Sequence, residues 1–481
     1  MNVLEKYQKL SVEVRATFWF TICNFILKGI SFITVPLFAR YLSPTEYGTV
    51  SIYNSYQQIF LIFATFELSL GAFQRGLIRY KNDIKMFTES LQILWSAITL
   101  ILFFAVFICR DTFVELTDTN VTIMTLMFTY FLVQPAYDCW INLKRFKYDY
   151  KLVVVVTILF AALSTGISVL CVKFIENTAI VRITSMLAVQ ILFCLPFYLR
   201  NVSIKSIITK RKIVKEYWIF ALKFQIPLVV HSLSYLILAQ SDRIMIGEMV
   251  GKTEAALYSI AYSLANVAII FQTSINQVMK PWRYQKMNEK KYDSIGKITN
   301  ILLLVLGGIL LLFILAAPEI MKLLFSEEYF EAVWTIPPIT LSVYFMFLYS
   351  IFSDIESYLY KTKYIMYASI VCATVNIVLN YFGIIKFGYI VCGYTTLISY
   401  VLFAIMHYKF MKKSCIDEGI GEKIFDENKI SILSLILIGL MVVFTTIYPY
   451  FWIRLILFFI IVIICIIKRD TILFALKELK I

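Results

Sequence analysis

Fourteen long apolar segments recur from one end of the 481-residue chain to the other, and they constrain its fold more than any other feature. Each segment is about 20 residues long, which is the length of an α-helix that crosses a bilayer. Hydrophobic residues make up 60% of the chain and charged residues 16%, against about 45–50% and about 25% in soluble globular proteins. The sequence therefore predicts an all-α integral membrane protein with about 14 transmembrane helices.

The predicted spans leave only short connections, none of them long enough for a separate folded domain. They are residues 16–38, 48–74, 88–109, 120–143, 152–174, 179–199, 218–241, 255–279, 298–318, 336–353, 364–385, 389–408, 430–448 and 451–467. The last span is short and carries Arg454 near its start, so we expect it to cross with its charged head group drawn toward the interface.

The distribution of basic residues predicts the orientation of these spans. If the N-terminus is cytoplasmic, 34 of the 45 Lys and Arg residues fall on the cytoplasmic side, nine fall outside or at the outer ends of spans, and the other two are Lys28 and Lys223. Cytoplasmic loops of membrane proteins are enriched in Lys and Arg. We therefore expect a multi-pass membrane protein with both termini in the cytoplasm.

The remaining composition argues against several function classes. The net charge of +14 is explained by this topology, and no stripe of basic and aromatic residues predicts nucleic-acid binding. The nine cysteines show no paired spacing and there are two histidines, so neither disulfides nor a metal site is expected. We find no catalytic motif and no phosphate-binding loop. Transport without a cofactor would then run on a proton or sodium gradient, on the membrane potential or downhill.

An internal repeat links the second and eighth spans at an offset of 208 residues. TEYGTVSIYNS (residues 45–55) matches TEAALYSIAYS (residues 253–263), and a stripe of mostly polar residues continues along one helical face in both. The two stripes are Ser51, Ser55, Gln58, Ile62, Thr65 and Ser69, and Ser259, Ser263, Asn266, Ile270, Thr273 and Gln277. Two readings are open, polar contacts between helices and a wet cavity. The repetition favours a cavity between parallel repeats, as in transporters.

Several further polar residues inside spans are candidates for substrate binding. In the first span, Lys28 lies about 18 Å deep on the same face as Asn24, where a charge is costly unless it is paired or hydrated. It pairs with Glu67 of the second span or serves as a cationic group for an anionic substrate. Other candidates, each with packing or interface roles as the alternative, are Gln58, Arg182, Gln225, Asp242, Arg243, Asn266 and Asn376.

Three motifs in order resemble the Wzx-type polysaccharide flippases of the multidrug/oligosaccharidyl-lipid/polysaccharide (MOP) exporter superfamily. They are PLFARYLSPTEYGTVSIY near the N-terminus, SDRIMIGEMVGKTEAALYSIAYSL in the middle and NIVLNYFGIIKFGYIVCGYTTLISY at residues 376–400. The resemblance implies two six-helix repeats that form a V around a central cavity. In that division, residues 1–212 and 213–412 form the two lobes, and 413–481 form two last helices with a groove for a lipid tail.

The resemblance also implies a substrate. It is an undecaprenyl-pyrophosphate-linked oligosaccharide, moved from the cytoplasmic to the outer leaflet by alternating access for surface polysaccharide synthesis. A polysaccharide polymerase and a chain-length regulator are the implied partners. The alternative is a multidrug or cation antiporter of the same superfamily, which would use acidic cavity residues. A more remote alternative is a membrane glycan polymerase or acyltransferase, which would need a long outer loop or a catalytic His/Asp set.

Overall fold

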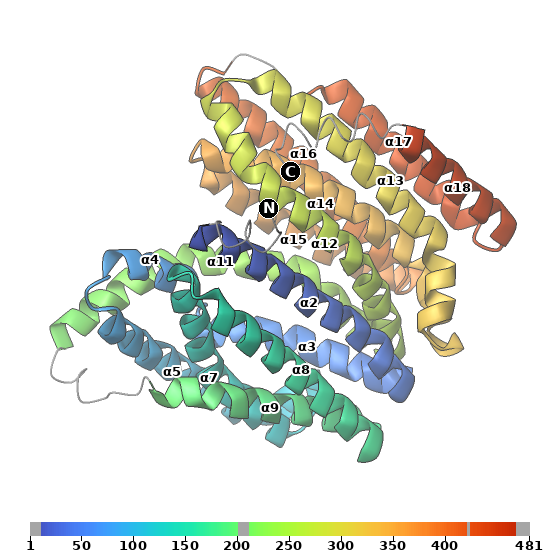
Figure 1. The fold of residues 1–481 in the computed structure, drawn as a ribbon. Helices are drawn as coiled ribbons and strands as arrows, with labels where there is room; N and C mark the ends of the chain where they lie inside the picture. Colours follow the sequence, from blue (N-terminus) through green and yellow to red (C-terminus); the bar gives the residue numbers. More distant parts are fainter. Residues whose placement is uncertain (1–10, 201–210, 421–423, 468–481) are drawn as a thin grey trace, which may run out of the picture. The chain divides into compact units, whose positions relative to one another are not determined.

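In the computed structural model, residues 11–200, 211–420 and 424–467 are described, and almost all of them lie in helices (Figure 1). No β-strand occurs in these three ranges. The prediction of an all-α protein is confirmed.

Contacts divide the chain into two units, Met1–Ile237 and Leu238–Ile481, and the change of unit falls within one helix, α11 (Arg211–Met249). The first unit also contains α2 (Val12–Tyr41), α3 (Pro44–Thr65), α4 (Gly71–Arg79), α5 (Ile84–Ile108), α6 (Arg110–Thr117), α7 (Val121–Phe146), α8 (Tyr150–Phe174) and α9 (Ala179–Arg200). The second contains α12 (Lys252–Asn288), α13 (Tyr292–Leu324), η1 (Glu327–Trp334), α14 (Ile336–Tyr358), α15 (Thr362–Phe387), α16 (Val391–Asp417), α17 (Glu427–Thr446) and α18 (Phe451–Ile467). The boundary between the two units therefore falls after Ile237 and not at residue 212. The division into residues 1–212, 213–412 and 413–481 stays a prediction.

Local sequence signals set where several helices begin. Ser43 precedes α3, its hydroxyl accepts a hydrogen bond from the backbone N–H of Glu46, and Pro44 occupies the first turn, where its missing N–H costs nothing. Asn120 caps α7 by accepting from the Ile123 N–H at 2.9 Å. Asp426 caps α17 in the same way. These side chains satisfy backbone N–H groups that have no partner within the helix.

Each unit has its own core. In the first unit, Phe73, Phe87 and Trp95 are buried together, and Gly76 is required there because a Cβ atom would overlap the Phe87 ring. In the second unit, α14 is the central helix, with every residue from Ile336 to Leu348 buried. It packs against α12, α13 and α16, while α17 and α18 lie beside α13 (Figure 1). Helices this apolar and this buried suit the interior of a membrane bundle.

Every predicted span contains a helix, but not all of these helices meet the length and hydropathy of a membrane span. Eleven do, and the bent pair α6 and α7, with 94° between them, makes up to twelve. The two others are α3, which carries the polar stripe, and α18, which is only 17 residues long. The count of 14 spans therefore stays a prediction, while the multi-pass membrane character is confirmed.

The second predicted span, residues 48–74, is wrong as one continuous helix. α3 ends at Thr65, Phe66 and Glu67 take left-handed backbone conformations, and α4 begins at Gly71. Ser69, the last residue of the predicted stripe, therefore lies beyond the helix. With 22 residues, α3 is about 33 Å long and matches the hydrocarbon thickness on its own.

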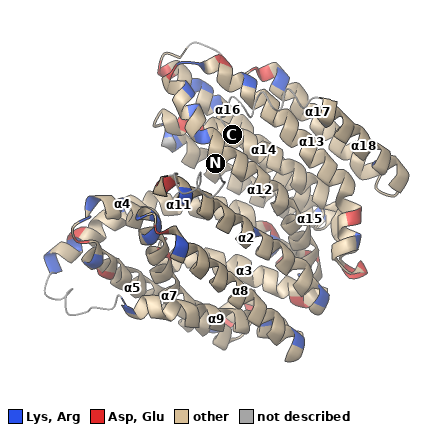
Figure 2. Ribbon diagram, viewed as in Figure 1, with Lys and Arg blue, Asp and Glu red and all other residues tan. Residues whose placement is uncertain are grey.

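Charged residues gather near the ends of the helices and are sparse along their middles (Figure 2). Two basic residues are exceptions because both are buried. Arg454 lies at the start of the last predicted span, and Arg283 belongs to a basic cluster just after the predicted span 255–279, which resembles a cytoplasmic anchor. Arg283 lies within α12 and is 0% exposed, so it is not a lipid-facing anchor. Arg454 is bonded to Glu319 of α13, with Nη2 and Oε1 2.7 Å apart, and this pair ties α18 to α13.

The predicted orientation is testable with reporter fusions. Fusions after Lys212, after Lys291 and at the C-terminus should report the cytoplasm, because the basic excess lies on that side. A fusion near Asp118, at the junction of α6 and α7, should report the outside. A reporter that is active outside at the C-terminus, or inside at Asp118, would contradict the orientation.

Candidate functional site

The matched polar stripes of the two repeats agree in exposure at two of their six positions. Ser51 of α3 and Ser259 of α12 are both buried, whereas Gln58 and Asn266 are both exposed. Asn24 of α2 is exposed as well. The hydroxyl of Ser55 donates to the Ser51 carbonyl at 3.0 Å, and that of Ser259 donates to the Ala255 carbonyl at 2.7 Å. Each stripe thus contains a buried serine bonded to its own helix and an exposed amide side chain.

Four other candidates lie in the first unit, and they differ in their surroundings. Gln225 of α11 is buried and accepts a hydrogen bond from the Ala72 N–H at 2.9 Å. Arg182 of α9 places its guanidinium 3.6 Å from the centre of the Phe38 ring, a cation–π contact. Lys28 is half-buried in α2, and Glu67 is half-buried in the break after α3. Pairing between Lys28 and Glu67 stays a prediction.

The structure brings Asp242 and Asn376 into one buried network in the second unit. Asp242 of α11 is 0% exposed, and its carboxylate accepts hydrogen bonds from Tyr258, Asn380 and Thr396. Asn376 accepts from Asn380 and from the Ser241 hydroxyl, each at 3.3 Å. The donors to Asp242 are neutral and both of its oxygens accept, which is how an ionised carboxylate is held in a protein interior.

Arg243, the neighbour of Asp242, donates hydrogen bonds to groups other than Asp242, although its guanidinium lies 5.9 Å from the centre of the Tyr258 ring. Its Nη1 donates to the Ala239 carbonyl at 2.8 Å and to the Gln240 side chain at 2.9 Å. The guanidinium lies 4.4 Å from the centre of the Tyr262 ring. Oxygen atoms of carboxylate, amide and hydroxyl groups therefore gather at Asp242 without a basic side chain hydrogen-bonded to it.

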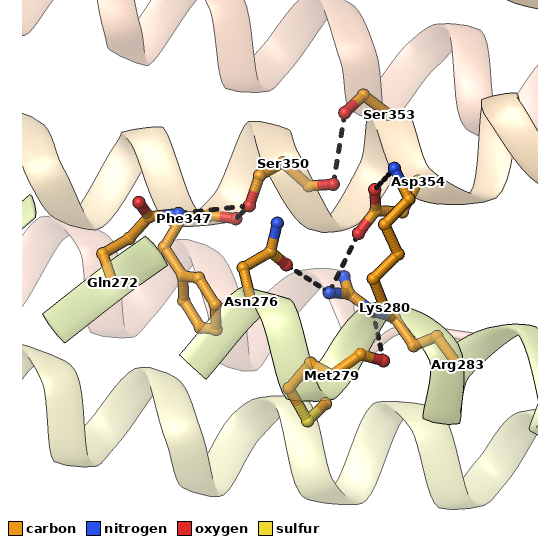
Figure 3. Close-up of polar contacts among 9 residues, drawn as sticks. All are labelled: Gln272, Asn276, Met279, Lys280, Arg283, Phe347, Ser350, Ser353 and Asp354. Carbon is orange, nitrogen blue, oxygen red and sulfur yellow. Dashed lines mark hydrogen bonds and ion pairs between the residues drawn. The ribbon is translucent and has the colours of Figure 1, made fainter. Parts of the chain in front are cut away.

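A second charged cluster joins α12 to α14 and was not predicted (Figure 3). Asp354 of α14 lies 3.0 Å from Nη2 of Arg283 and 3.1 Å from Nζ of Lys280. The same Nη2 donates to the Asn276 side chain at 2.5 Å. Asp354 and Arg283 are almost fully buried, whereas the Lys280 side chain is 49% exposed. One carboxylate thus holds a buried cation and a half-exposed one.

A third buried pair lies between α14 and α16. Nδ1 of His407 is 3.1 Å from both carboxylate oxygens of Glu356, and both side chains are 0% exposed. The Tyr349 and Phe403 rings pack against the imidazole. This pair holds the two helices together inside the second unit. In the described ranges, no group of three or more His, Cys, Asp or Glu residues is placed to hold a metal ion.

An apolar groove of about 560 Å³ runs between α14, α16 and α17. Its walls are Phe345, Leu348, Phe352, Val401, Ala404, Ile405, Ile430, Leu435 and Ile438. Lys409, Lys412 and Glu427 line the end where α16 finishes and α17 begins, and Lys412 is 2.9 Å from Glu427. α17 lines this groove together with α14 and α16, whereas α18 packs on α13. The expected groove between the two last helices stays a prediction.

Comparisons with known proteins agree on one superfamily. The family model described as "Polysaccharide biosynthesis protein" matches residues 14–287, and the MatE model matches residues 227–382. A Haemophilus influenzae protein named "Lsg locus putative protein 1" is 22% identical over 272 residues, which cover 55% of this chain. The match spans 64% of that relative, less than two thirds of its length.

Solved structures show the same fold. The lipid II flippase MurJ in an inward closed conformation has a TM-score of 0.68 at 16% identity, over 94% of this chain and 99% of that one. An inward-facing multidrug resistance MATE family transporter of the MOP superfamily has a TM-score of 0.60 at 12% identity, over 82% and 96%. A Vibrio cholerae MATE transporter has a TM-score of 0.58 at 9% identity, over 85% and 97%.

Proposed function

Because the chain belongs to the polysaccharide biosynthesis protein family, we propose that it is a flippase for undecaprenyl-pyrophosphate-linked oligosaccharides. It moves them from the cytoplasmic to the outer leaflet of the bacterial inner membrane by alternating access. The family and the MOP-superfamily fold support a lipid-linked flippase, and the specific lipid and sugar are our proposal. A polysaccharide polymerase and a chain-length regulator would act on the same lipid-linked units.

The observation that carries this proposal is the groove between α14, α16 and α17. Its walls are almost entirely apolar, and its volume of about 560 Å³ lies within the usual range of ligand pockets. Lys409 is exposed at the charged end. A lipid with a long hydrocarbon tail and an anionic head matches both features, because the tail gains from burial and a phosphate gains from a nearby ammonium.

Filling the groove should block transport of the lipid-linked substrate. Ser431 of α17 lines the groove, so Ser431→Trp would place an indole where the tail lies. In proteoliposomes, we expect the transport rate of an undecaprenyl-pyrophosphate oligosaccharide to fall about tenfold or more, which corresponds to about 1.4 kcal/mol. The matched control is Ile432→Trp, since Ile432 is 57% exposed and does not line the groove. If Ser431→Trp and Ile432→Trp transport the substrate at equal rates, the groove does not take part in transport.

The driving force is proposed to be a proton or sodium gradient. A buried carboxylate in a membrane helix is costly and is a candidate for ion exchange by default. Asp242 fits this description because its oxygens, and those of Asn376 and Thr396, gather in the interior of the second unit. Asp242→Asn should then weaken the response of transport to an imposed sodium or proton gradient more than Asn266→Asp, a charge change at an exposed site.

A multidrug or cation antiporter is the second candidate. The match of the MatE model to residues 227–382 favours it, and Asp242 would then serve as the acidic group for a cationic drug. Efflux of a fluorescent cationic drug from loaded vesicles separates the two functions. Drug efflux without movement of lipid-linked sugar would show that the protein is an antiporter and not a flippase.

A further inference from the structure

The break between α3 and α4 has no counterpart in the second repeat. Phe66 and Glu67 both have positive φ angles, and neither is glycine or asparagine, the residues that adopt this conformation most easily. At the matched positions, residues 274–278, α12 continues as a regular helix. The break is therefore a feature of the first unit alone, and tertiary contacts maintain it.

Side chains from neighbouring helices satisfy the backbone groups that the break releases. Thr99 of α5 donates to the Ala64 carbonyl at 2.8 Å, and Asn142 of α7 donates to the Ser69 carbonyl at 2.9 Å. Gln225 of α11 accepts from the Ala72 N–H. Irregular backbone within a membrane protein persists where polar groups surround it, and broken helices of transporters form ion and substrate sites.

Asp138 of α7 joins this polar shell through Ser69. Gln134 donates to Oδ2 of Asp138 at 2.6 Å, and the Ser69 hydroxyl donates to the same oxygen at 3.4 Å. Within the described ranges, no hydrogen bond reaches Oδ1 and no ion pair involves Asp138. An acid in an apolar helix that has two neutral donors and no cation bonded to it is less costly in its protonated form than in its ionised form.

Asp242 in the second unit shows the opposite pattern. Its Oδ1 accepts from Asn380 and its Oδ2 accepts from Tyr258 and Thr396, so three neutral donors, spread over both oxygens, favour its ionised form. The contrast matters because both carboxylates lie in long apolar helices, α7 and α11, where an ionised group without a partner is costly. Asp138 is also partly exposed, whereas Asp242 is 0% exposed. A proton can therefore reach Asp138 more easily.

The titratable groups around Asp138 do not supply a compensating charge in contact with it. Tyr130, Tyr137 and Cys139 of α7 and Cys194 of α9 interact with it electrostatically. These types of side chain are neutral near pH 7. Tyr53 of α3 interacts with Tyr130 of this group, and Glu67 is the acid of the break itself. Among the described residues, Arg145, farther along α7, is the cation that acts on Asp138 electrostatically.

We propose that Asp138 is a proton-binding site beside the α3–α4 break, and that it exchanges this proton during transport. In the state described here, the acid is protonated and accepts from Gln134 and Ser69. When Asp138 loses this proton, its carboxylate needs further hydrogen-bond donors. Ser69 lies in the break and donates to Asp138, so it connects this change to the α3–α4 break. The protonation of Asp138 does not depend on the proposed flippase function, whereas the exchange of its proton during transport rests on that function.

Infrared spectroscopy of the full-length protein in lipid tests protonation without any substrate. The wild-type spectrum at neutral pH should contain the carbonyl stretch of a protonated carboxylic acid, shifted in D₂O and lost at high pH. Asp138→Asn should remove this band, because the amide keeps a carbonyl oxygen for Gln134 and Ser69 but has no acid proton. The matched control, Asp242→Asn, should keep it. A band that is absent from the wild type, or unchanged in Asp138→Asn, would overturn the assignment.

Proteoliposomes test the exchange step. A pH gradient should change the transport rate of the wild type, and Asp138→Asn should transport at equal rates with and without the gradient. If the wild type and Asp138→Asn respond equally to the gradient, Asp138 does not exchange its proton during transport. If the wild type moves no lipid-linked sugar, the proposed function fails, while the infrared result still decides protonation.

Discussion

Arg283→Ala should lower the free energy of unfolding by about 3–5 kcal/mol, because it leaves the Asp354 carboxylate buried without its closest buried partner. The guanidinium is 0% exposed and lies 3.0 Å from Asp354. It also anchors the Asn276 side chain on α12. Unfolding of the purified protein in mixed micelles, followed by intrinsic fluorescence, measures this loss.

Two further variants separate the buried charge from the exposed one. Lys280 contacts the same carboxylate but is half exposed, so Lys280→Ala should cost about 1 kcal/mol or less. The double change Arg283→Met, Asp354→Leu should recover most of the stability, since well-packed apolar residues often replace a buried ion pair without loss. Equal losses for Arg283→Ala and Lys280→Ala would contradict the role of burial.

Lys28→Ala should abolish export of surface polysaccharide while the amount of protein in the membrane stays normal. The half-buried ammonium of Lys28 lies in the middle of α2. A charge at this depth of a membrane helix is costly, so its presence indicates a role in function. An unpaired Glu67 can take up a proton, so the fold should survive. Lys28→Arg should keep part of the activity, because a guanidinium also binds phosphate with a different geometry. Export and membrane levels are compared by surface staining and immunoblotting.

The double variant Lys28→Ala, Glu67→Ala decides why the lysine is needed. If the cation contacts the substrate, the double variant stays inactive at a normal protein level. If the lysine only balances Glu67, removing both charges restores export. Restored export would therefore show that our assignment of Lys28 to the substrate is wrong.

The helices were predictable because apolar segments of membrane length have few alternatives in a bilayer. The break after Thr65 was not, since Phe66 and Glu67 carry no turn signal. The break depends on Asn142, Thr99 and Gln225, which are distant in sequence. A local pattern of residues cannot report such partners.

The polar sites were predictable in part. Asp242 and Asn376 were recognised separately from their positions in apolar spans, and only the fold shows that Asn380 connects them. Arg283 belonged to a basic cluster that resembled a cytoplasmic anchor. Its partner Asp354 lies on another helix, and α12 extends beyond the predicted span to Asn288. Charge placement therefore did not show which charges are buried, and the orientation that it indicates stays a prediction.

Movement of a lipid-linked sugar across a bilayer by the purified protein tests the central claim most directly. Vesicles would carry a fluorescent undecaprenyl-pyrophosphate oligosaccharide in the inner leaflet, and a membrane-impermeant quencher would be added outside. We predict that the label becomes accessible to the quencher at a rate that rises with the amount of wild-type protein. In protein-free vesicles the label should stay protected. Label that stays protected in vesicles with correctly folded protein, while a cationic drug leaves the same vesicles, would contradict the account.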